Sequence, residues 1–239
     1  NQRYHDRYPE MGTAPVSTEP YYSPEYFELE REYIFKKTWM NAGRVEEIAN
    51  AGDFIVKELP VCDTEVLIVR DRDDSINAFH NVCSHRGNKI AYDASGNNRS
   101  FSCRFHGWTY KLNGELTVVP DEENYFDLDT SCLGLTPVHV GEWGGFIFIN
   151  VDPEPRETLL EYLGDLGAGL DGYPFAETSG QVFTFETVVN ANWKLVKDAF
   201  QEVCHTPYQH SRSLPDAFIS DANPHTRFID MAVVGYHAR

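Results

Sequence analysis

Two short segments of this chain each combine one cysteine with one histidine. They are Cys83-Ser84-His85 and Cys103-Arg104-Phe105-His106, and 17 residues lie between them. Two thiolates and two imidazoles supply four metal ligands. Such a set suits a tetrahedral zinc ion, or a [2Fe–2S] cluster in which two cysteines hold one iron and two histidines hold the other. The two segments therefore predict a metal centre.

The spacing of the ligands favours the cluster over zinc. Zinc fingers usually pair Cys with Cys in one turn and His with His on a helix. Here each segment carries one ligand of each type, which suits a cluster that is held from two sides. Gly87 and Gly107 closely follow the two histidines, and glycine lets backbone N–H groups approach cluster sulfides. On the residues alone, a structural zinc ion remains the alternative.

Composition and charge limit the classes of protein to consider. The 239 residues, 13% of them aromatic and 24% charged, allow a globular core and one or two domains. A net charge of −17 argues against partners such as nucleic acid or an anionic membrane surface. No apolar run reaches the ~20 residues of a spanning helix, and we expect no signal peptide. Cys62, Cys132 and Cys204 lack disulfide-like spacing, so we expect small buried or half-buried thiols and a cytoplasmic protein.

Local patterns place the two metal segments in an all-β region. Residues 1–20 read as an extended arm, and Ser23-Pro24 predicts the start of a helix that runs to about Lys37. Between about residues 40 and 152, short segments predict strands, and Asn113-Gly114 predicts a hairpin turn. The metal segments are then loops at hairpin ends, held by a rigid sheet. The predicted strands are 53–58, 65–70, 75–81, 109–112, 116–119 and 146–151.

The second half of the chain changes character after a proline-rich segment, residues 152–155, which predicts a domain boundary. Helices are predicted over 158–170 and 192–205, and strands over 181–189 and 228–236. We therefore expect an α+β fold. It combines an all-β cluster domain with part of a second domain, in which helices pack on an antiparallel sheet. The expected domains are an N-terminal arm and helix over 1–39, the cluster domain over 40–155 and the second domain over 156–239.

A second pair of histidines, His205 and His210, flanks the sequence Thr-Pro-Tyr-Gln. On an ideal helix, residues five positions apart point about 140° away from each other, so one metal can take both only if the helix breaks between them. Pro207 is expected to make this break. Two histidines plus a carboxylate, with open coordination positions, form the non-haem Fe(II) site that activates oxygen.

Three polar residues before this pair, Asp198, Glu202 and His205, are spaced four and three apart, so on a continuous helix they would share one face. A solvated helix face explains such a stripe by itself. However, a histidine that binds a metal usually donates its second N–H to a carboxylate, and Glu202 is placed to accept it. We therefore predict that Glu202 orients His205.

The pattern Cys-x-His-Arg-Gly, followed by Cys-x-x-His-Gly-Trp, resembles the Rieske proteins and, within them, the Rieske non-haem iron oxygenases. The run from Asn192-Trp193-Lys194 to His205-x4-His210 resembles the start of their catalytic domain. The resemblance implies a catalytic α subunit of the ring-hydroxylating type. It implies a Rieske [2Fe–2S] cluster on Cys83, His85, Cys103 and His106, and a mononuclear Fe(II) on His205 and His210. It also implies that Glu202 links His106 of one subunit to His205 of its neighbour.

The same resemblance implies an activity and partners. The enzyme would use O₂ and electrons from NAD(P)H to hydroxylate a small organic substrate, which family frequency suggests is aromatic. A separate reductase, often with a ferredoxin, would deliver the electrons to a homotrimer or an α3β3 assembly.

Two features depart from the family pattern. Cys204 stands where the family usually has Tyr. The family's third iron ligand, an Asp far downstream, has no counterpart here. We therefore expect these residues to be the front half of a longer polypeptide.

Two other functions remain open on the sequence. One is a Rieske-type electron-transfer protein without oxygen chemistry, which would contain the cluster iron alone. The other is a zinc-stabilised binding module, which would be colourless.

Overall fold

The structure of the chain is a computed structural model. It describes residues 6, 9–12, 14–177, 185–202, 205–210, 212–213, 233–234 and 237–238. The contacts between residues divide the chain into two compact units. One unit joins residues 1–29 to 185–229, and the other joins residues 30–184 to 230–239. Each unit therefore combines segments that are far apart in the sequence.

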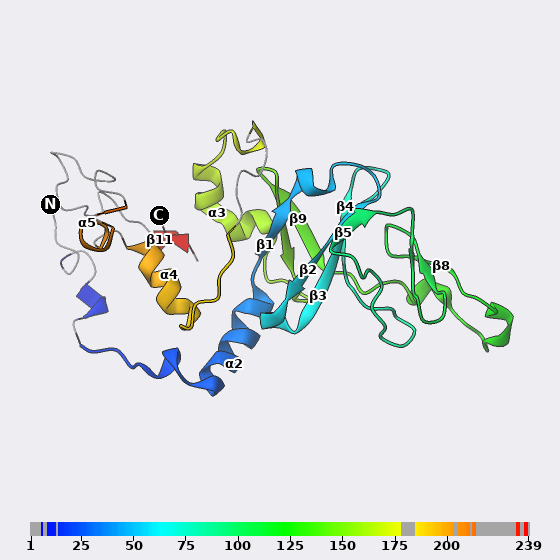
Figure 1. The fold of residues 1–239 in the computed structure, drawn as a ribbon, viewed down its shortest axis with the longest axis horizontal. Helices are drawn as coiled ribbons and strands as arrows, with labels where there is room; N and C mark the ends of the chain where they lie inside the picture. Colours follow the sequence, from blue (N-terminus) through cyan, green and yellow to red (C-terminus); the bar gives the residue numbers. More distant parts are fainter. Residues whose placement is uncertain are drawn as a thin grey trace. The chain divides into compact units, whose positions relative to one another are not determined.

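Antiparallel sheets make up most of the larger unit (Figure 1). Their strand orders are β1-β10-β9, β4-β3-β2-β5 and β6-β7-β8. The strands are β1 Met40–Arg44, β2 Asp53–Leu59, β3 Thr64–Arg70, β4 Ile76–His80, β5 Ser95–Asn97, β6 Phe101–Ser102, β7 Thr109–Tyr110, β8 Leu116–Val118, β9 His139–Trp143 and β10 Phe146–Asn150. Every predicted strand in this region overlaps one of these, so the all-β prediction is confirmed.

Strand β3 lies between two hydrophobic cores. Its residues Val66–Val69 are 0% exposed. Val66 and Ile68 pack in the core that also contains Ile147 and Ile149. Leu67 and Val69 pack in the other core. One strand can serve both cores because successive side chains point to opposite faces of a sheet. The core that contains Leu67 and Val69 also contains Cys83 and Cys103, so the packing that holds the sheets also anchors the metal segments.

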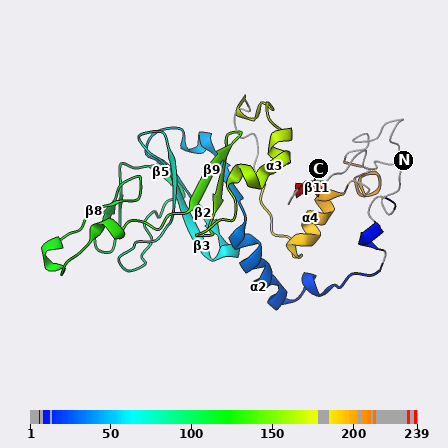
Figure 2. The ribbon, with the colours of Figure 1, turned by 180° about the vertical axis from the view of Figure 1, so that it is seen from behind.

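The turn predicted at Asn113-Gly114 joins β7 to β8. Gly114 has a φ of +83°, and its N–H donates to the carbonyl of Lys111 at 3.1 Å. A Cβ atom at this position would overlap the ring of Phe79, so backbone conformation and packing both require glycine. The green segment that follows β8 extends outward from the sheets in both views (Figures 1 and 2).

The α-helices of the described residues are α2 Pro24–Tyr33, α3 Leu159–Gly169, α4 Trp193–Gln201 and α5 Thr206–Gln209. α2 begins where Ser23-Pro24 predicted it, and the Ser23 hydroxyl accepts the Tyr26 N–H at 3.1 Å. Thr158 and Glu161 form a capping box at the start of α3, which is interrupted at Gly164. Short 3-10 turns lie at Pro9–Met11, Glu19–Tyr21, Phe35–Lys37, Val45–Ile48, Pro60–Cys62, Glu122–Asn124, Thr130–Cys132 and Phe175–Glu177.

The helix predicted over 192–205 ends earlier than expected. α4 stops at Gln201, and Glu202 has the extended backbone angles φ −114° and ψ 148°. The interpretation that Asp198, Glu202 and His205 share a helix face is therefore wrong. The break precedes His205 and is not made by Pro207, which lies in the first turn of α5, where a missing N–H costs no helical hydrogen bond.

The strand predicted over 181–189 is also wrong for residues 185–189, which form no strand. Phe185 and Val188 are 73% and 96% exposed, and alternation gives a strand only where a sheet partner covers one face. Residues 181–184 lie outside the described part. Of the strand predicted over 228–236, Val233–Val234 form β11, which pairs with β12, His237–Ala238. The rest of that prediction falls on residues that are not described.

Cys62 is a buried free thiol, as expected, whereas Cys132 is free and exposed, which corrects the expectation. Cys204 is not among the described residues. None of the described helices combines the length and the apolar character that crossing a membrane requires.

An ion pair joins the end of the N-terminal helical segment to the chain after β10. The Asp152 side chain is 4% exposed, and it accepts hydrogen bonds from Lys37 Nζ at 2.8 Å and from the Glu154 N–H at 3.2 Å. Burial by itself would raise the pKa of Asp152. The hydrogen bonds from Lys37 and from the Glu154 N–H outweigh burial, so the pKa is lowered. The pair therefore stabilises the fold only while Asp152 is ionised.

We predict that Lys37→Met lowers the free energy of unfolding at pH 7 by about 1–3 kcal/mol, because a buried carboxylate loses its cation. The matched control is Lys111→Met. It breaks an ion pair of the same 2.8 Å length in which Lys111 and Glu115 are 55% and 61% exposed, so the loss should stay within about 0.5 kcal/mol. Urea unfolding of the three proteins measures both losses.

The pH dependence follows from the lowered pKa of Asp152. A carboxyl whose pKa is lower in the folded state stabilises the protein above its unfolded pKa, about 4, and this contribution is lost as the pH falls through the folded pKa. The difference between the wild-type chain and Lys37→Met should therefore shrink below about pH 4. Equal losses in the two variants at pH 7 would contradict the assignment.

Candidate metal centres

The two metal segments fold into loops with the same backbone hydrogen bonds. In each, the glycine four residues after the cysteine donates its N–H to the cysteine carbonyl, at 3.0 Å for Gly87 and 2.9 Å for Gly107. The cysteine N–H in turn donates to the carbonyl five residues ahead, at 2.7 Å for Asn88 and 2.8 Å for Trp108. The two segments, which were alike in composition, are therefore also alike in backbone structure.

The two cysteines lie in the same hydrophobic core. Cys83 and Cys103 are both buried there, and each thiol shifts the pKa of the other. Burial alone would raise the pKa of the Cys103 thiol, but the N–H groups of Phe105 and His106 outweigh it and lower the pKa. At Cys83 burial dominates and raises the pKa. The thiolate is the form that binds metal, and the backbone around Cys103 already favours it.

The two histidines of these loops also face each other. The ring centroids of His85 and His106 are 4.7 Å apart, and His85 stacks on Trp108 at 4.6 Å. Burial, followed by the charge of His106, lowers the pKa of His85, so its ring is neutral near pH 7, as a metal ligand must be. Its Nδ1 is buried and has no hydrogen-bond partner. Because buried polar atoms almost always have a partner, this nitrogen fits a metal ligand.

The arrangement of these four side chains favours the cluster over zinc. A structural zinc ion needs ligands that converge on one point. Across the described ranges, no three His, Cys, Asp or Glu side chains are grouped to hold one metal ion. Each iron of a Rieske-type cluster takes only two protein ligands, and here the four separate into a thiol pair and an imidazole pair. These residues therefore fit a [2Fe–2S] cluster.

The structure adds neighbours that the sequence analysis missed. Tyr110 is fully buried, its hydroxyl lies 3.1 Å from Cys83 Sγ, and it accepts the Ser84 N–H at 3.2 Å. Burial, together with the nearby Cys83, raises the pKa of Tyr110, so the phenol keeps its proton as a hydrogen-bond donor. Tyr125 meets the rings of His85 and Trp108 edge-on, at 6.4 and 6.2 Å. The one sequence signal for Tyr110 was its position two residues after Trp108.

The second histidine pair lies in the smaller unit. The ring centroids of His205 and His210 are 5.2 Å apart. The hydrogen bond predicted between Glu202 and His205 is present: one carboxylate oxygen bonds the ring Nδ1, and the other accepts the His205 N–H at 3.2 Å. Ser213 Oγ lies 3.5 Å from Nδ1 of His210. With Nδ1 engaged in each ring, Nε2 is the nitrogen that a metal would take.

The side chains that the structure describes do not complete this second centre. No third His, Cys, Asp or Glu joins His205 and His210 to form a group of three among them. The pair fits two positions of a site with two histidines and one carboxylate, and it leaves the carboxylate position unassigned.

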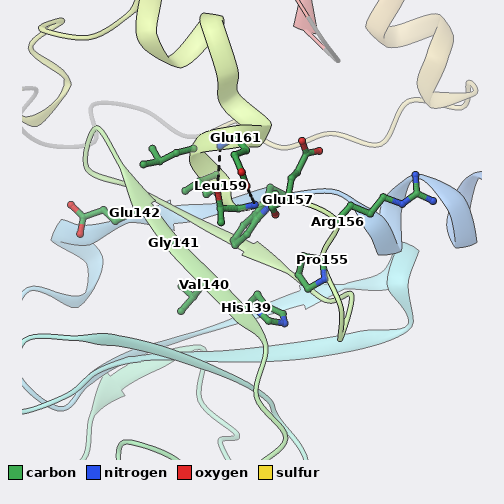
Figure 3. A pocket seen from close by; sticks show the side chains of 12 residues that line it. His139, Val140, Gly141, Glu142, Pro155, Arg156, Glu157, Leu159 and Glu161 are labelled. Atoms are coloured by element: carbon green, nitrogen blue, oxygen red, sulfur yellow. Dashed lines mark hydrogen bonds between the residues drawn. The ribbon is translucent and has the colours of Figure 1, made fainter.

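A groove of about 670 Å³ lies in the larger unit (Figure 3). It is lined by His139–Glu142 of β9, by residues 155–161 leading into α3, and by Trp39. None of the site residues predicted from the sequence lines it.

Comparisons with known proteins agree with the geometry. Residues 38–137 match the family model described as the Rieske [2Fe-2S] domain. The chain is 34% identical over 185 residues to the carnitine monooxygenase oxygenase subunit of Escherichia coli (strain K12), covering 77% of this chain and 49% of the relative. It is 35% identical over 198 residues to the large oxygenase component of the naphthalene 1,2-dioxygenase system of Pseudomonas aeruginosa, covering 80% of this chain and 43% of the relative.

Solved structures give the same result. The quaternary ammonium Rieske monooxygenase CntA in complex with L-carnitine is similar with a TM-score of 0.73 and 30% identity, covering 83% of this chain and 56% of that one. Naphthalene 1,2-dioxygenase from Rhodococcus sp. bound to indole is similar with a TM-score of 0.71 and 32% identity, covering 84% and 47%. The chain spans about half the length of the curated relatives it matches. The predicted Rieske domain and α+β fold class are confirmed.

The equivalent glycines of the two ligand loops give a matched test. Gly87 and Gly107 have φ values of +74° and +75°, so an alanine is strained at either position. A Cβ atom at Gly107 would also lie 2.9 Å from Pro120, whereas one at Gly87 would meet nothing within 4 Å. We predict that Gly107→Ala loses more cluster iron than Gly87→Ala on mild heating, as followed by the visible absorbance. Equal loss would show that the contact with Pro120 is unimportant.

Proposed function

We propose that this chain, which belongs to the Rieske oxygenases, forms part of the terminal oxygenase of a multicomponent system that uses O₂ to oxidise a small organic substrate. The observation that carries this proposal is the pair of equivalent loops, which bring together two thiols and two imidazoles, one of which has a buried and unpartnered nitrogen, Nδ1 of His85. When bound, a Rieske cluster supplies one-electron transfer and a mononuclear non-haem iron supplies oxygen activation.

The proposal assigns each pair of ligand side chains to a metal ion. Cys83 and Cys103 would hold one iron of the cluster, and His85 and His106 would hold the other. His205 and His210 would hold the mononuclear iron, with a third ligand from outside the described residues. The protein's own contribution is to orient these ligands, to donate hydrogen bonds to the sulfurs and to keep the partly buried ring of His85 neutral.

Glu202 is proposed to connect the two centres between subunits. A carboxylate offers about four lone-pair sites, and two of these take the ring and the backbone N–H of His205. As the family resemblance implies, this carboxylate would also accept an N–H from His106 of a neighbouring subunit. The structure of one relative, a quaternary ammonium Rieske monooxygenase, is described as giving insight into carnitine oxidation and inter-subunit electron transfer. This proposal implies a ring of subunits, a homotrimer or an α3β3 assembly.

The electron source and the substrate are proposed more broadly. Electrons would come from NAD(P)H through a separate reductase, with or without a ferredoxin. The relatives described above are named for a quaternary ammonium compound, carnitine, or for an aromatic compound, naphthalene. The expectation of an aromatic substrate therefore stays a prediction. Oxygen uptake with a panel drawn from both classes would decide it.

Metal analysis separates the proposal from its two alternatives. We predict about two irons and two acid-labile sulfides per chain for the cluster, and a third iron where the mononuclear site is filled. The reduced protein should show the electron paramagnetic resonance spectrum of a Rieske cluster. Zinc without sulfide would support the zinc-stabilised module instead. A cluster without a third iron or any oxygen uptake would support the electron-transfer protein.

A second prediction concerns Glu202. Glu202→Gln should leave the cluster spectrum intact but slow electron delivery to the mononuclear iron by at least tenfold, since the amide loses one acceptor oxygen and the negative charge. Asp198→Asn, a like-for-like change on the exposed side of α4, is the control and should transfer electrons normally. Rapid mixing of the reduced holoprotein with O₂ and substrate, with cluster oxidation followed by absorbance, gives both rates. Normal rates in Glu202→Gln would defeat the bridging role.

A further inference from the structure

Asn88 touches both cysteine loops of the cluster site. Its backbone carbonyl accepts the Cys83 N–H at 2.7 Å, which closes the first loop. Its side-chain Nδ2 reaches the other loop and donates to Cys103 Sγ at 3.6 Å. Each cysteine sulfur therefore has one side-chain hydrogen-bond partner, Tyr110 for Cys83 and Asn88 for Cys103.

The amide of Asn88 is held in this position by further contacts. Nδ2 also lies 2.9 Å from the Tyr92 hydroxyl and 3.0 Å from the carbonyl of Lys89, so its two hydrogens are shared among three acceptors. The guanidinium of Arg104, which follows Cys103 in the chain, lies over the Tyr92 ring at 4.3 Å from its centroid. Asn88 is half-buried and Tyr92 is exposed, so this set of residues runs from the protein surface to the sulfur of Cys103.

A donor at a cysteine sulfur changes the balance between the two redox states of a cluster. The reduced cluster carries one more electron than the oxidised one, and the extra negative charge makes its sulfurs better acceptors. A hydrogen bond to a ligand sulfur therefore stabilises the reduced state more than the oxidised state and raises the reduction potential. The amide is neutral, so this effect comes from its N–H dipole.

We propose that Asn88 is a positioning residue that raises the reduction potential of the cluster through its N–H···S bond to Cys103, with Tyr92 and the carbonyl of Lys89 holding the amide in place. The inference rests on the cluster part of the proposed function and does not require oxygenase activity. It assigns to Asn88 a role that the ligand motif does not predict, because the residue lies outside the four ligands.

The test is the midpoint potential of the cluster in the full chain, measured by mediated titration and followed by electron paramagnetic resonance. Asn88→Leu removes the donor and keeps a side chain of similar size. We expect its equilibrium constant for reduction to fall by about tenfold, which is about 59 mV for a one-electron couple. Asn98→Leu, the same change at an exposed position of the same domain, should leave the potential unchanged. Tyr92→Phe should shift it less than Asn88→Leu.

The outcomes distinguish this inference from the proposed function. No Rieske spectrum in the wild-type chain would defeat the proposed function itself. A wild-type cluster whose potential is the same in Asn88→Leu, or higher, would overturn the inference alone. Should Asn88→Leu fail to bind the cluster, Asn88→Ala takes its place in the titration. If neither variant binds the cluster, Asn88 is required for cluster assembly, and the proposal that it raises the reduction potential is overturned.

Discussion

The cluster site depends on one constraint: two sulfurs that must carry negative charge lie in an apolar core. Cys83 and Cys103 are 2% and 3% exposed, and burial opposes ionisation of both. Backbone N–H groups of the ligand loops and the side chains of Tyr110 and Asn88 compensate by donating hydrogen bonds to the sulfurs. These donors are held in place by the closed loops with their glycines, and by the core that the cysteines share with Leu67 and Val69 of β3.

The histidine side of the site meets a different requirement. An imidazole that binds metal must be neutral and correctly oriented, but it carries no charge that the core must compensate. Stacking on Trp108 orients His85, and partial burial keeps its ring neutral. The two cysteines, which carry the charge of the ligand set, are therefore more deeply buried than the two histidines, which lie nearer to solvent.

The second centre obtains its geometry from a break in the helix. Because α4 ends at Gln201, Glu202 adopts an extended backbone and its carboxylate turns back to hold both the ring and the N–H of His205. A continuous helix would instead have presented the two residues as separate side chains on one face. The break in the helix therefore lets Glu202 accept both hydrogen bonds from His205, and these fix the orientation of the His205 ring.

The sequence by itself determined the identity and spacing of the ligands, the hairpin at Asn113-Gly114 and the strands around it, because these depend on local residue types and short-range periodicity. Local pattern failed at residues 185–189, which alternate but form no strand, and at the end of α4, which stops at Gln201. Only the tertiary structure brought Tyr110 and Asn88 to the sulfurs, across 27 and 15 residues. Their positions depend on how the loops and strands pack together, and local spacing in the sequence does not encode that packing.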